Sequence, residues 1–592
     1  MSDFTFCENA LFFSIKQDFA NLNVENELKK LPTYGKRNVC ENGTYAGLNY
    51  NFIMFKTDPK PPTFYKGSDN FWKEIKIAYI LLVYNEDYIA ILKQNTNIPH
   101  KIEERIQQID YEILLKIFIN RTTEYKHLSM QNTDGSDSAI RSKSYNAVDL
   151  KRNISTVSAS KYFIQNMRGS NGINDSFALN TNTSRINQFK QKKDFNQICT
   201  WTKDIFHRLK KIKPTKHDKG FLSHFANHEK FDNAKNLKPS SILLHTQSLL
   251  DILNYATEAS TKVANTIKKK IPIYEVAQKK VFETNNEVVF QLNGSEKIIL
   301  KILKNRIEIK NDLWEKCDLS ISTNDETEST TLEAYINKEN LFSVFFDDKT
   351  FTYSNGQLFS NHRLINDAQG FLHFFKKEPL LDKVDCEKFL GKQSSNGKRT
   401  WDADSEFQMM VNHYSDKHNC FICDDCKTEW ADFIGIDKNQ VTFYACKYAK
   451  INDDSASASK FHDVISQALK NLGNLSPTER QLGKKRADWK NTYLQSQIRR
   501  SKSTNNEIDN AVDNWRDAHH QPNFKKNSVL VVNFISYSGL KKRFKAVQNI
   551  FTNANNSTAR NDETTFQQIW LISSFISTCL EAGITPKIIC GS

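Results

Sequence analysis

The segment DDCKTEWADFIGID, residues 424–437, followed closely by VTFYACKYA, residues 441–449, decides the fold of the C-terminal region. Both segments are rich in β-branched and aromatic residues, which predicts two neighbouring strands joined through the polar residues Asp437–Gln440. Side chains alternate between the two faces of a strand, so any loop with an even number of residues places Asp432 and Lys447 on the same face. A loop with an odd number of residues would place them on opposite faces.

The face that carries Asp432 and Lys447 is otherwise apolar. Its other members are Trp430, Ile434, Ile436, Val441, Phe443 and Ala445. Depending on the turn, Asp432 lies opposite Ala445 or opposite Lys447. An unpaired carboxylate or ammonium on such a face would cost on the order of several kcal/mol. The two groups therefore need each other, as a structural salt bridge across the hairpin, or a metal ion, or the phosphate of a substrate.

A carboxylate and a lysine on neighbouring strands suit the hydrolysis of phosphodiesters. The carboxylate would hold a hard divalent cation, commonly Mg²⁺, which takes oxygen ligands. Such a cation lowers the pKa of a water molecule and offsets the charge that develops on the phosphate. The lysine would position or deprotonate that water, or stabilise the transition state.

The C-terminal region resembles the PD-(D/E)xK nuclease superfamily, which has the restriction endonuclease fold. The resemblance lies in the expected order of elements: a helix at 404–413, strands at 419–424, 430–437 and 441–449, a helix at 458–472 and a strand at 529–535. More narrowly, three segments are similar to nuclease-type regions of bacterial helicase-like and defence proteins. These are EWADFI at 429–434, FYACKYA at 443–449 and FHDVISQALK at 461–470.

The resemblance implies roles for four side chains. Asp432 would be the metal-binding acid and Lys447 the lysine of the superfamily motif. Gln467 would be the glutamine that many members carry on the following helix, and Glu406 the acid on the preceding helix.

The superfamily places a second acid two residues before the lysine, and here that residue is Ala445. We expect Glu406 or Glu429 to supply the missing carboxylate, with the backbone carbonyl of Cys446 as a further metal ligand. If neither does, the site is catalytically dead.

The function implied by the resemblance is a cytoplasmic, bacterial DNA nuclease that depends on Mg²⁺ or Mn²⁺. Endonuclease action is expected ahead of exonuclease action, and RNA remains open as a substrate. Antiviral or restriction-type defence is the expected role, which leaves open a partner subunit of a defence system and a homo-oligomer. Two alternatives stand beside it: a catalytically inactive nucleic-acid-binding protein with a degenerate nuclease fold, which Ala445 motivates, and a protein-interaction or structural subunit.

Composition agrees with a polyanionic partner. The chain has 592 residues with a formal net charge of +14, and its pI is about 9.0, which favours nucleic acid ahead of a membrane surface. No apolar run reaches the length of a membrane span. We expect no membrane association, and the lack of an export signal predicts reduced cysteines in a cytoplasm.

Basic clusters are the expected contacts to phosphate groups. One cluster comprises Lys484, Lys485, Arg486, Arg499 and Arg500, and another comprises Lys541, Lys542 and Arg543. A third basic run, residues 187–220, is interleaved with Trp201 and Phe206. The alternative for each cluster is a solvated surface.

The expected fold class is a multidomain α+β protein. Residues 1–127 would form a mixed α/β domain and residues 128–186 a polar linker or loop. Residues 187–391 would form a basic helical segment and a β-rich middle domain. Residues 398–592 would form the nuclease-like domain, an α/β core with a mixed central sheet.

The spacing of cysteines at Cys420, Cys423 and Cys426 also fits a zinc or iron–sulfur site. A strand at 419–424 would send Cys420 and Cys423 to opposite faces, which favours buried structural cysteines instead.

Overall fold

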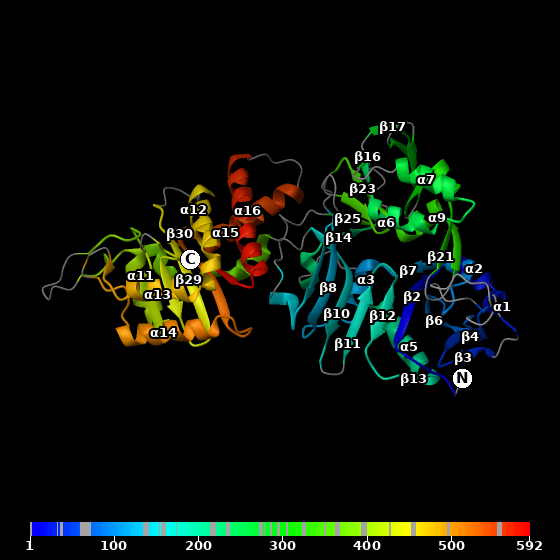
Figure 1. Ribbon diagram of the computed structural model, residues 1–592, viewed down its shortest axis with the longest axis horizontal. Coiled ribbons are helices and arrows are strands. Elements are labelled where there is room, and N and C mark those ends of the chain that lie inside the picture. Colours follow the sequence, from blue (N-terminus) through cyan, green and yellow to red (C-terminus); the bar gives the residue numbers. More distant parts are fainter. Residues whose placement is uncertain are drawn as a thin grey trace. The chain divides into compact units, whose positions relative to one another are not determined.

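The computed structural model divides the chain into two compact units, residues 1–152 with 161–361, and residues 153–160 with 362–592 (Figure 1). The structure describes all residues except 1–2, 32–33, 36–38, 60–72, 134–140, 153, 155–160, 173–174, 213–220, 232–236, 271–275, 278, 285–286, 293–295, 304–305, 323–326, 349–350, 361–367, 392–398, 426–427, 451–457, 494–495, 497 and 553–558. No helix in this described part is long and apolar enough to cross a bilayer.

The first unit is built mainly from antiparallel sheets. The largest has 11 strands in the order β3 (Val39–Tyr45), β4 (Leu48–Lys56), β5 (Ile77–Tyr84), β6 (Tyr88–Gln94), β2 (Asn9–Ile15), β12 (Arg185–Gln188), β11 (Ser176–Asn180), β10 (Tyr162–Ser170), β8 (Glu124–Asn132) and β9 (Ser142–Asn146), with β7 (Ile106–Gln108) paired to β2. A second has the order β14 (Asn227–Glu229), β25 (Gln357–Ser360), β24 (Phe351–Ser354), β23 (Phe342–Phe346), β15 (Pro239–Leu244) and β16 (Val276–Ala277).

Smaller sheets and short helices complete this unit. The sheets are β17 (Lys279–Glu283), β18 (Glu287–Gln291), β19 (Lys297–Ile302) and β20 (Ile307–Lys310); β21 (Asp318–Ser322) with β22 (Thr327–Thr331); and β1 (Thr5–Phe6) with β13 (Lys193–Asp194). The helices are α1 (Val24–Lys29), α2 (His100–Glu103), α3 (Tyr111–Lys116), α5 (Phe195–Lys211), α6 (Thr246–Ile252), α7 (Thr261–Lys270), α8 (Asp312–Glu315) and α9 (Leu332–Glu339).

The expected polar linker at 128–186 is wrong, because this segment holds β9, β10, β11 and parts of β8 and β12. Its polar side chains satisfy one another across the strands. The Asn180 amide donates to Oδ1 of Asn166 at 2.7 Å, and the Gln165 amide donates to Oε1 of Gln131 at 2.6 Å. The few apolar residues of β11 and β12 are buried in alternation, which is a strand pattern, but they are too sparse to stand out in the sequence.

Much of the basic run 187–220 belongs to helix α5, whose aromatic residues are buried in the core. A capping box between Asp194 and Gln197 starts α5, and Trp201 and Phe206 are buried against Phe12. This favours the solvated-surface alternative, in which the aromatic residues serve the core and the cations face water.

The second unit contains a mixed six-stranded sheet. Its order is β26 (Phe375–Lys377), β31 (Thr585–Gly591), β30 (Lys525–Ser536), β29 (Gln440–Lys447), β28 (Phe433–Ile436) and β27 (Cys420–Cys423). The pairs among β27, β28 and β29 are antiparallel, whereas β29, β30, β31 and β26 pair in parallel. Because β26 pairs with β31, residues from 362 onward belong to this unit, so the expected domain boundary near 391–398 is too late. Residues 392–398 themselves lie outside the described part.

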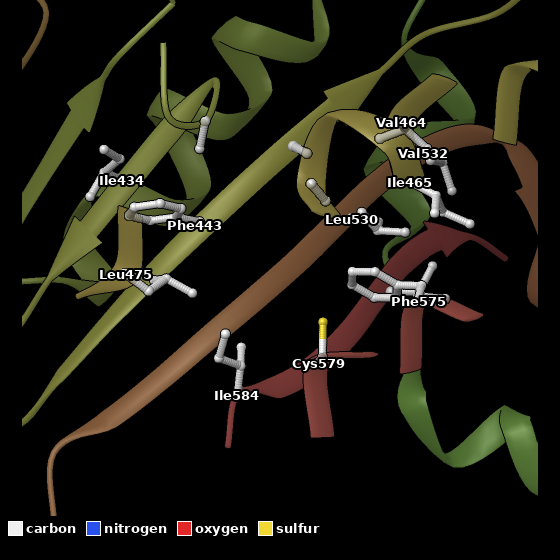
Figure 2. Close-up of a cluster of buried hydrophobic side chains, with 14 of the residues drawn as sticks. Ile434, Phe443, Val464, Ile465, Leu475, Leu530, Val532, Phe575, Cys579 and Ile584 are labelled. Carbon is white, nitrogen blue, oxygen red and sulfur yellow. The ribbon is translucent and has the colours of Figure 1, made fainter. Parts of the chain in front are cut away.

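Helices cover both faces of this sheet. One face carries α11 (Glu406–Tyr414), and the other carries α12 (Ala458–Lys470), α13 (Glu479–Trp489), α14 (Asn505–Ala518), α15 (Tyr537–Thr552) and α16 (Ala559–Glu581). Continuous apolar runs such as Val529–Val532 are buried because parallel strands have helices on both sides. Figure 2 shows Leu530 and Val532 of β30 facing Val464 and Ile465 of α12 and Phe575 of α16.

Replacement of Leu530 by Ala tests this core. Leu530 lies fully buried on the central strand β30, so its truncation removes apolar contacts and leaves a cavity. We expect the free energy of unfolding to fall by about 2–5 kcal/mol, measured by denaturant titration. A loss below about 1 kcal/mol would contradict this packing.

Candidate functional site

The hairpin between β28 and β29 sets the geometry of the site. Ile436 pairs with Val441 and Phe433 with Tyr444, which corresponds to an even loop. The same register places Asp432 opposite Ala445. The expected apolar face is confirmed, because all six of its predicted members belong to one hydrophobic core.

Asp432 and Lys447 line the same cleft, which has a volume of about 420 Å³. The end of β29 and Asp432, directly before β28, form one wall, and α12 forms another. The other lining residues are Glu387, Lys388, Glu429, Cys446, His462, Asp463, Ser466, Gln467 and Lys470. The cleft therefore unites five of the residues expected from the sequence: Asp432, Lys447, Gln467, Glu429 and Cys446.

The carboxyl group of Asp432 is buried and forms no ion pair with a described residue, although the charge of Lys388 acts on it. Its side chain is 3% exposed, and Oδ2 accepts a hydrogen bond from the backbone N–H of Cys446 at 2.8 Å. Burial, reinforced by the charges of Asp425 and Glu429, raises the pKa of Asp432 to about 8. The sequence left open a structural salt bridge between Asp432 and Lys447. That alternative is wrong, because no ion pair joins these two described residues.

Three carboxylates meet beside the cleft, which Glu429 and Asp432 line and Asp425 does not. Oxygens of Asp425, Glu429 and Asp432 lie within 4.8 Å of one another. The amide of Gln467 donates to Oε1 of Glu429 at 3.3 Å and points to Oδ2 of Asp432 at 3.5 Å. Gln467 thus holds two of the acids in place. Glu429 lies next to Asp432, where a second carboxylate was expected. Burial raises the pKa of Glu429 as well.

Glu406 lies at the start of α11 and is fully buried. Neither of its carboxyl oxygens has a hydrogen-bond partner. Burial raises its pKa well above the usual range, and the negative charges of Glu387 and Asp432 raise it further, whereas Lys447 acts in the opposite direction. The charge of Asp432 affects the pKa of Glu406, but Glu406 is not among the residues that line the cleft.

Glu387, Lys388 and Asp425 were not foreseen from the sequence. The ammonium of Lys388 pairs with Oδ2 of Asp425 at 2.9 Å, and Tyr493 donates to the same oxygen at 2.9 Å. Glu387 accepts weakly from the backbone N–H of Tyr448 at 3.5 Å. Residues 387 and 388 reach the cleft through tertiary packing, so no local pattern identifies them. Asp425 was visible only as an acid four residues before Glu429.

The structure contradicts part of the expected phosphate-contacting clusters. Lys485 is 3% exposed, and its ammonium lies 2.6 Å from Oδ1 and 2.7 Å from Oδ2 of Asp424. Trp489 and the backbone of Trp430 also donate to this buried carboxylate. Lys485 is therefore a counter-charge inside the core and is not a surface contact.

Arg500 and Arg486 are also engaged inside the protein. Arg500 is buried and donates to the backbone carbonyls of Cys423 and Asp425 at 3.0 and 3.1 Å. Arg486 forms ion pairs with Asp509 and Asp513 of α14. The exposed members of the expected clusters are Lys484, Arg499, Lys541 and Lys542, and Arg543 is half-buried.

Cys420 and Cys423 belong to cores on opposite faces of the sheet, as strand alternation predicts, and Cys426 lies outside the described residues. The expectation that these cysteines are structural is confirmed for the two described ones.

The donor set at the cleft fits a hard divalent cation. Such ions take carboxylate oxygens, and three of these converge here. Two buried acids, Asp432 and Glu406, lack a counter-charge within ion-pair distance among the described residues. A cation would favour the ionised form of Asp432, which burial and the charges of Asp425 and Glu429 disfavour.

Comparison with models of known protein families gives no match for this chain, and comparison with curated proteins gives none either.

Replacement of Asp432 by Asn tests whether ionisation of this buried carboxyl group destabilises the folded protein. The folded pKa of about 8 exceeds the usual value of 3.8, so the folded state binds the proton more tightly than the unfolded state. Stability is then lost as pH rises from about 4 towards 8. Asn keeps the hydrogen bond without ionising, so at pH 8 we expect its Tm to exceed wild type by about 2 °C or more. At pH 4 the difference should vanish, and a constant difference at both pH values would contradict the account.

The ion pair between Lys485 and Asp424 gives a second prediction. Lys485→Met leaves the Asp424 carboxylate buried without its counter-charge, and we expect a loss of about 3–5 kcal/mol in unfolding free energy. The exposed neighbour Lys484 offers a matched control, since Lys484→Met should change stability by less than about 0.5 kcal/mol. Equal effects of the two substitutions would argue against the buried pair.

Proposed function

We propose that this protein is a metal-dependent nuclease that hydrolyses phosphodiester bonds, with DNA as its substrate. The observation that carries the proposal is the meeting of the Asp425, Glu429 and Asp432 carboxylates beside a cleft that Lys447 also lines. Among the described residues, the Lys447 ammonium has no ion-pair partner. The order of α11, the β27–β28–β29 meander, α12 and the parallel strand β30 agrees with the restriction-endonuclease-like core implied by the sequence resemblance. The net charge of +14 supports a polyanionic substrate.

Asp432, Glu429 and Asp425 would hold the cation, with Glu406 as a nearby buried acid. Bound Mg²⁺ or Mn²⁺ would supply an activated water and charge compensation on the phosphate. Asp432 is rigid because the backbone of Cys446 fixes one oxygen and Gln467 faces the same oxygen. Rigid ligands favour a defined metal geometry.

Lys447 would contact the phosphate that is cut. It lines the cleft, and its ammonium has no ion pair or side-chain hydrogen bond with a described residue. An ammonium in this position donates to a non-bridging phosphate oxygen and stabilises its growing negative charge. Lys470 of α12 also lines the cleft and would bring further positive charge to the substrate.

Ala445 motivates the second candidate, an inactive nucleic-acid-binding protein. Ala445 is buried opposite Asp432 and supplies no ligand. Glu429 in the cleft and Asp425 next to it provide carboxylates near Asp432, and this favours an active site. Endonuclease action, a cytoplasmic defence role, a partner subunit and a homo-oligomer belong to the same proposal and rest on the sequence resemblance.

Substitutions at Asp432 and Lys447 test the proposal. Asp432→Ala removes a metal ligand, and Lys447→Ala removes the charge that faces the phosphate. We expect each to reduce Mg²⁺-dependent cleavage of plasmid and single-stranded DNA by about 100-fold or more. Asp416→Ala, at an exposed residue beyond α11, is the control and should cut normally.

If both variants cut like wild type, the site assignment is wrong. If wild type binds DNA but cuts neither with Mg²⁺ nor with Mn²⁺, the inactive binding protein is the correct function.

A further inference from the structure

Three lysines gather at the edge of the second unit's sheet, away from the clusters visible in the sequence. Lys376 lies on β26, Lys587 on β31 and Lys417 in the turn after α11. Lys376 pairs with Ile589 in the parallel register. Lys587, two residues before Ile589, therefore projects from the same face as Lys376.

The ring of Tyr414 joins two of these lysines. The ammonium of Lys417 lies 3.8 Å from the ring centroid, and that of Lys376 lies 5.8 Å from it. A tyrosine ring attracts a cation to its face, so both ammonium groups are drawn to one place. The Tyr414 hydroxyl donates to Oε2 of Glu378 at 3.1 Å, which fixes the ring.

The positive charge of this cluster is not neutralised. None of the three ammonium groups forms an ion pair or a hydrogen bond with a described residue. Burial, the first cause, and the charge of Lys376 lower the pKa of Lys417, with Glu378 opposing them. Burial, then Lys376 and Lys417, lower the pKa of Lys587. The groups therefore repel one another, and a bound anion would relieve this repulsion.

The contrast with the α13–α14 region strengthens the inference. There the cations of Arg486, Lys490 and Arg516 pair with Asp509, Asp513 and Asp517. Cations already paired to carboxylates have less to gain from a phosphate, because the existing pair must first be broken. The unpaired lysine cluster has no such competitor within ion-pair distance among the described residues.

We propose that Lys376, Lys417 and Lys587, grouped around Tyr414, form a phosphate-binding site that holds the backbone of a nucleic acid outside the cleft. Tyr414 ends the helix that begins with Glu406, so Tyr414 lies about 12 Å along α11 from that buried acid.

Nucleic acid fits this site better than a lipid surface. Interfacial membrane binding needs apolar side chains that insert beside the basic ones. Among the described residues, no large exposed hydrophobic side chain belongs to β26, β31 or the turn after α11. Backbone phosphates need only positive charge at suitable spacing.

The test uses the full chain in EDTA, so that binding is measured without cleavage. Fluorescence anisotropy with a labelled single-stranded DNA is recorded between about 50 and 200 mM salt. Loss of three phosphate contacts in the triple variant K376Q/K417Q/K587Q should reduce the slope of log K against log salt by about 2. Affinity at low salt should fall by about tenfold or more.

A matched control removes the same charge elsewhere in this unit. Lys383, Lys438 and Lys525 are exposed, and the triple variant K383Q/K438Q/K525Q should leave the slope unchanged. Thermal unfolding confirms that both variants are folded. An unchanged slope in the first variant, or equal losses in both, would overturn the proposal.

A second arm uses vesicles containing phosphatidylserine. The choice of nucleic acid would be overturned if the protein bound these vesicles more tightly than DNA and the triple variant K376Q/K417Q/K587Q lost that binding. This site does not depend on catalysis, so Asp432→Ala should bind DNA with an unchanged salt slope. Loss of cleavage and loss of this binding can therefore be told apart.

Discussion

The buried carboxyl group of Asp432 is the constraint on which the rest of the site depends. It lies on an apolar face of the sheet, held by one backbone hydrogen bond from Cys446, and the negative charges of Asp425 and Glu429 act on it against the opposing charge of Lys388. Burial and like charges raise its pKa to about 8, so the fold tolerates the acid mainly in its neutral form. In the proposed function, a bound divalent cation would reverse this preference, because it would stabilise the ionised carboxylate together with those of Glu429 and Asp425.

The alternation of apolar and polar residues predicted much of the second unit. Strands β27 to β30, helices α11 and α12, and the shared face of Asp432 and Lys447 follow from local patterns because each depends on neighbours close in sequence. Glu387 and Lys388 could not be predicted, since their segment is held in place by tertiary contacts, in which the backbone N–H groups of Glu406 and Phe407 donate to the carbonyls of Cys386 and Glu387. The polar strands at 128–186 were missed because their side chains bond to one another across the sheet rather than facing water.

The distribution of paired and unpaired cations separates structural from functional charge. Runs of basic residues in a sequence suggest contacts to phosphate. Lys485, however, forms a buried ion pair with Asp424, and Arg486 forms an ion pair with Asp513 of α14. The lysines without carboxylate partners among the described residues include Lys447 in the cleft and the cluster around Tyr414. These come from separate elements, and only the folded sheet brings them together. Nucleic-acid contacts are therefore better inferred from the pairing of cations in space than from their density along the chain.

Proton release on metal binding tests the central claim most directly. If Asp432 is neutral in the metal-free protein and ionised in the metal-bound protein, each cation that binds at pH 7 must displace about one proton. Titration calorimetry with Mn²⁺ in buffers of different ionisation enthalpy measures that number. The account predicts release of about one proton per ion in wild type and its loss in Asp432→Asn. Binding without proton release, or no saturable binding at all, would contradict it.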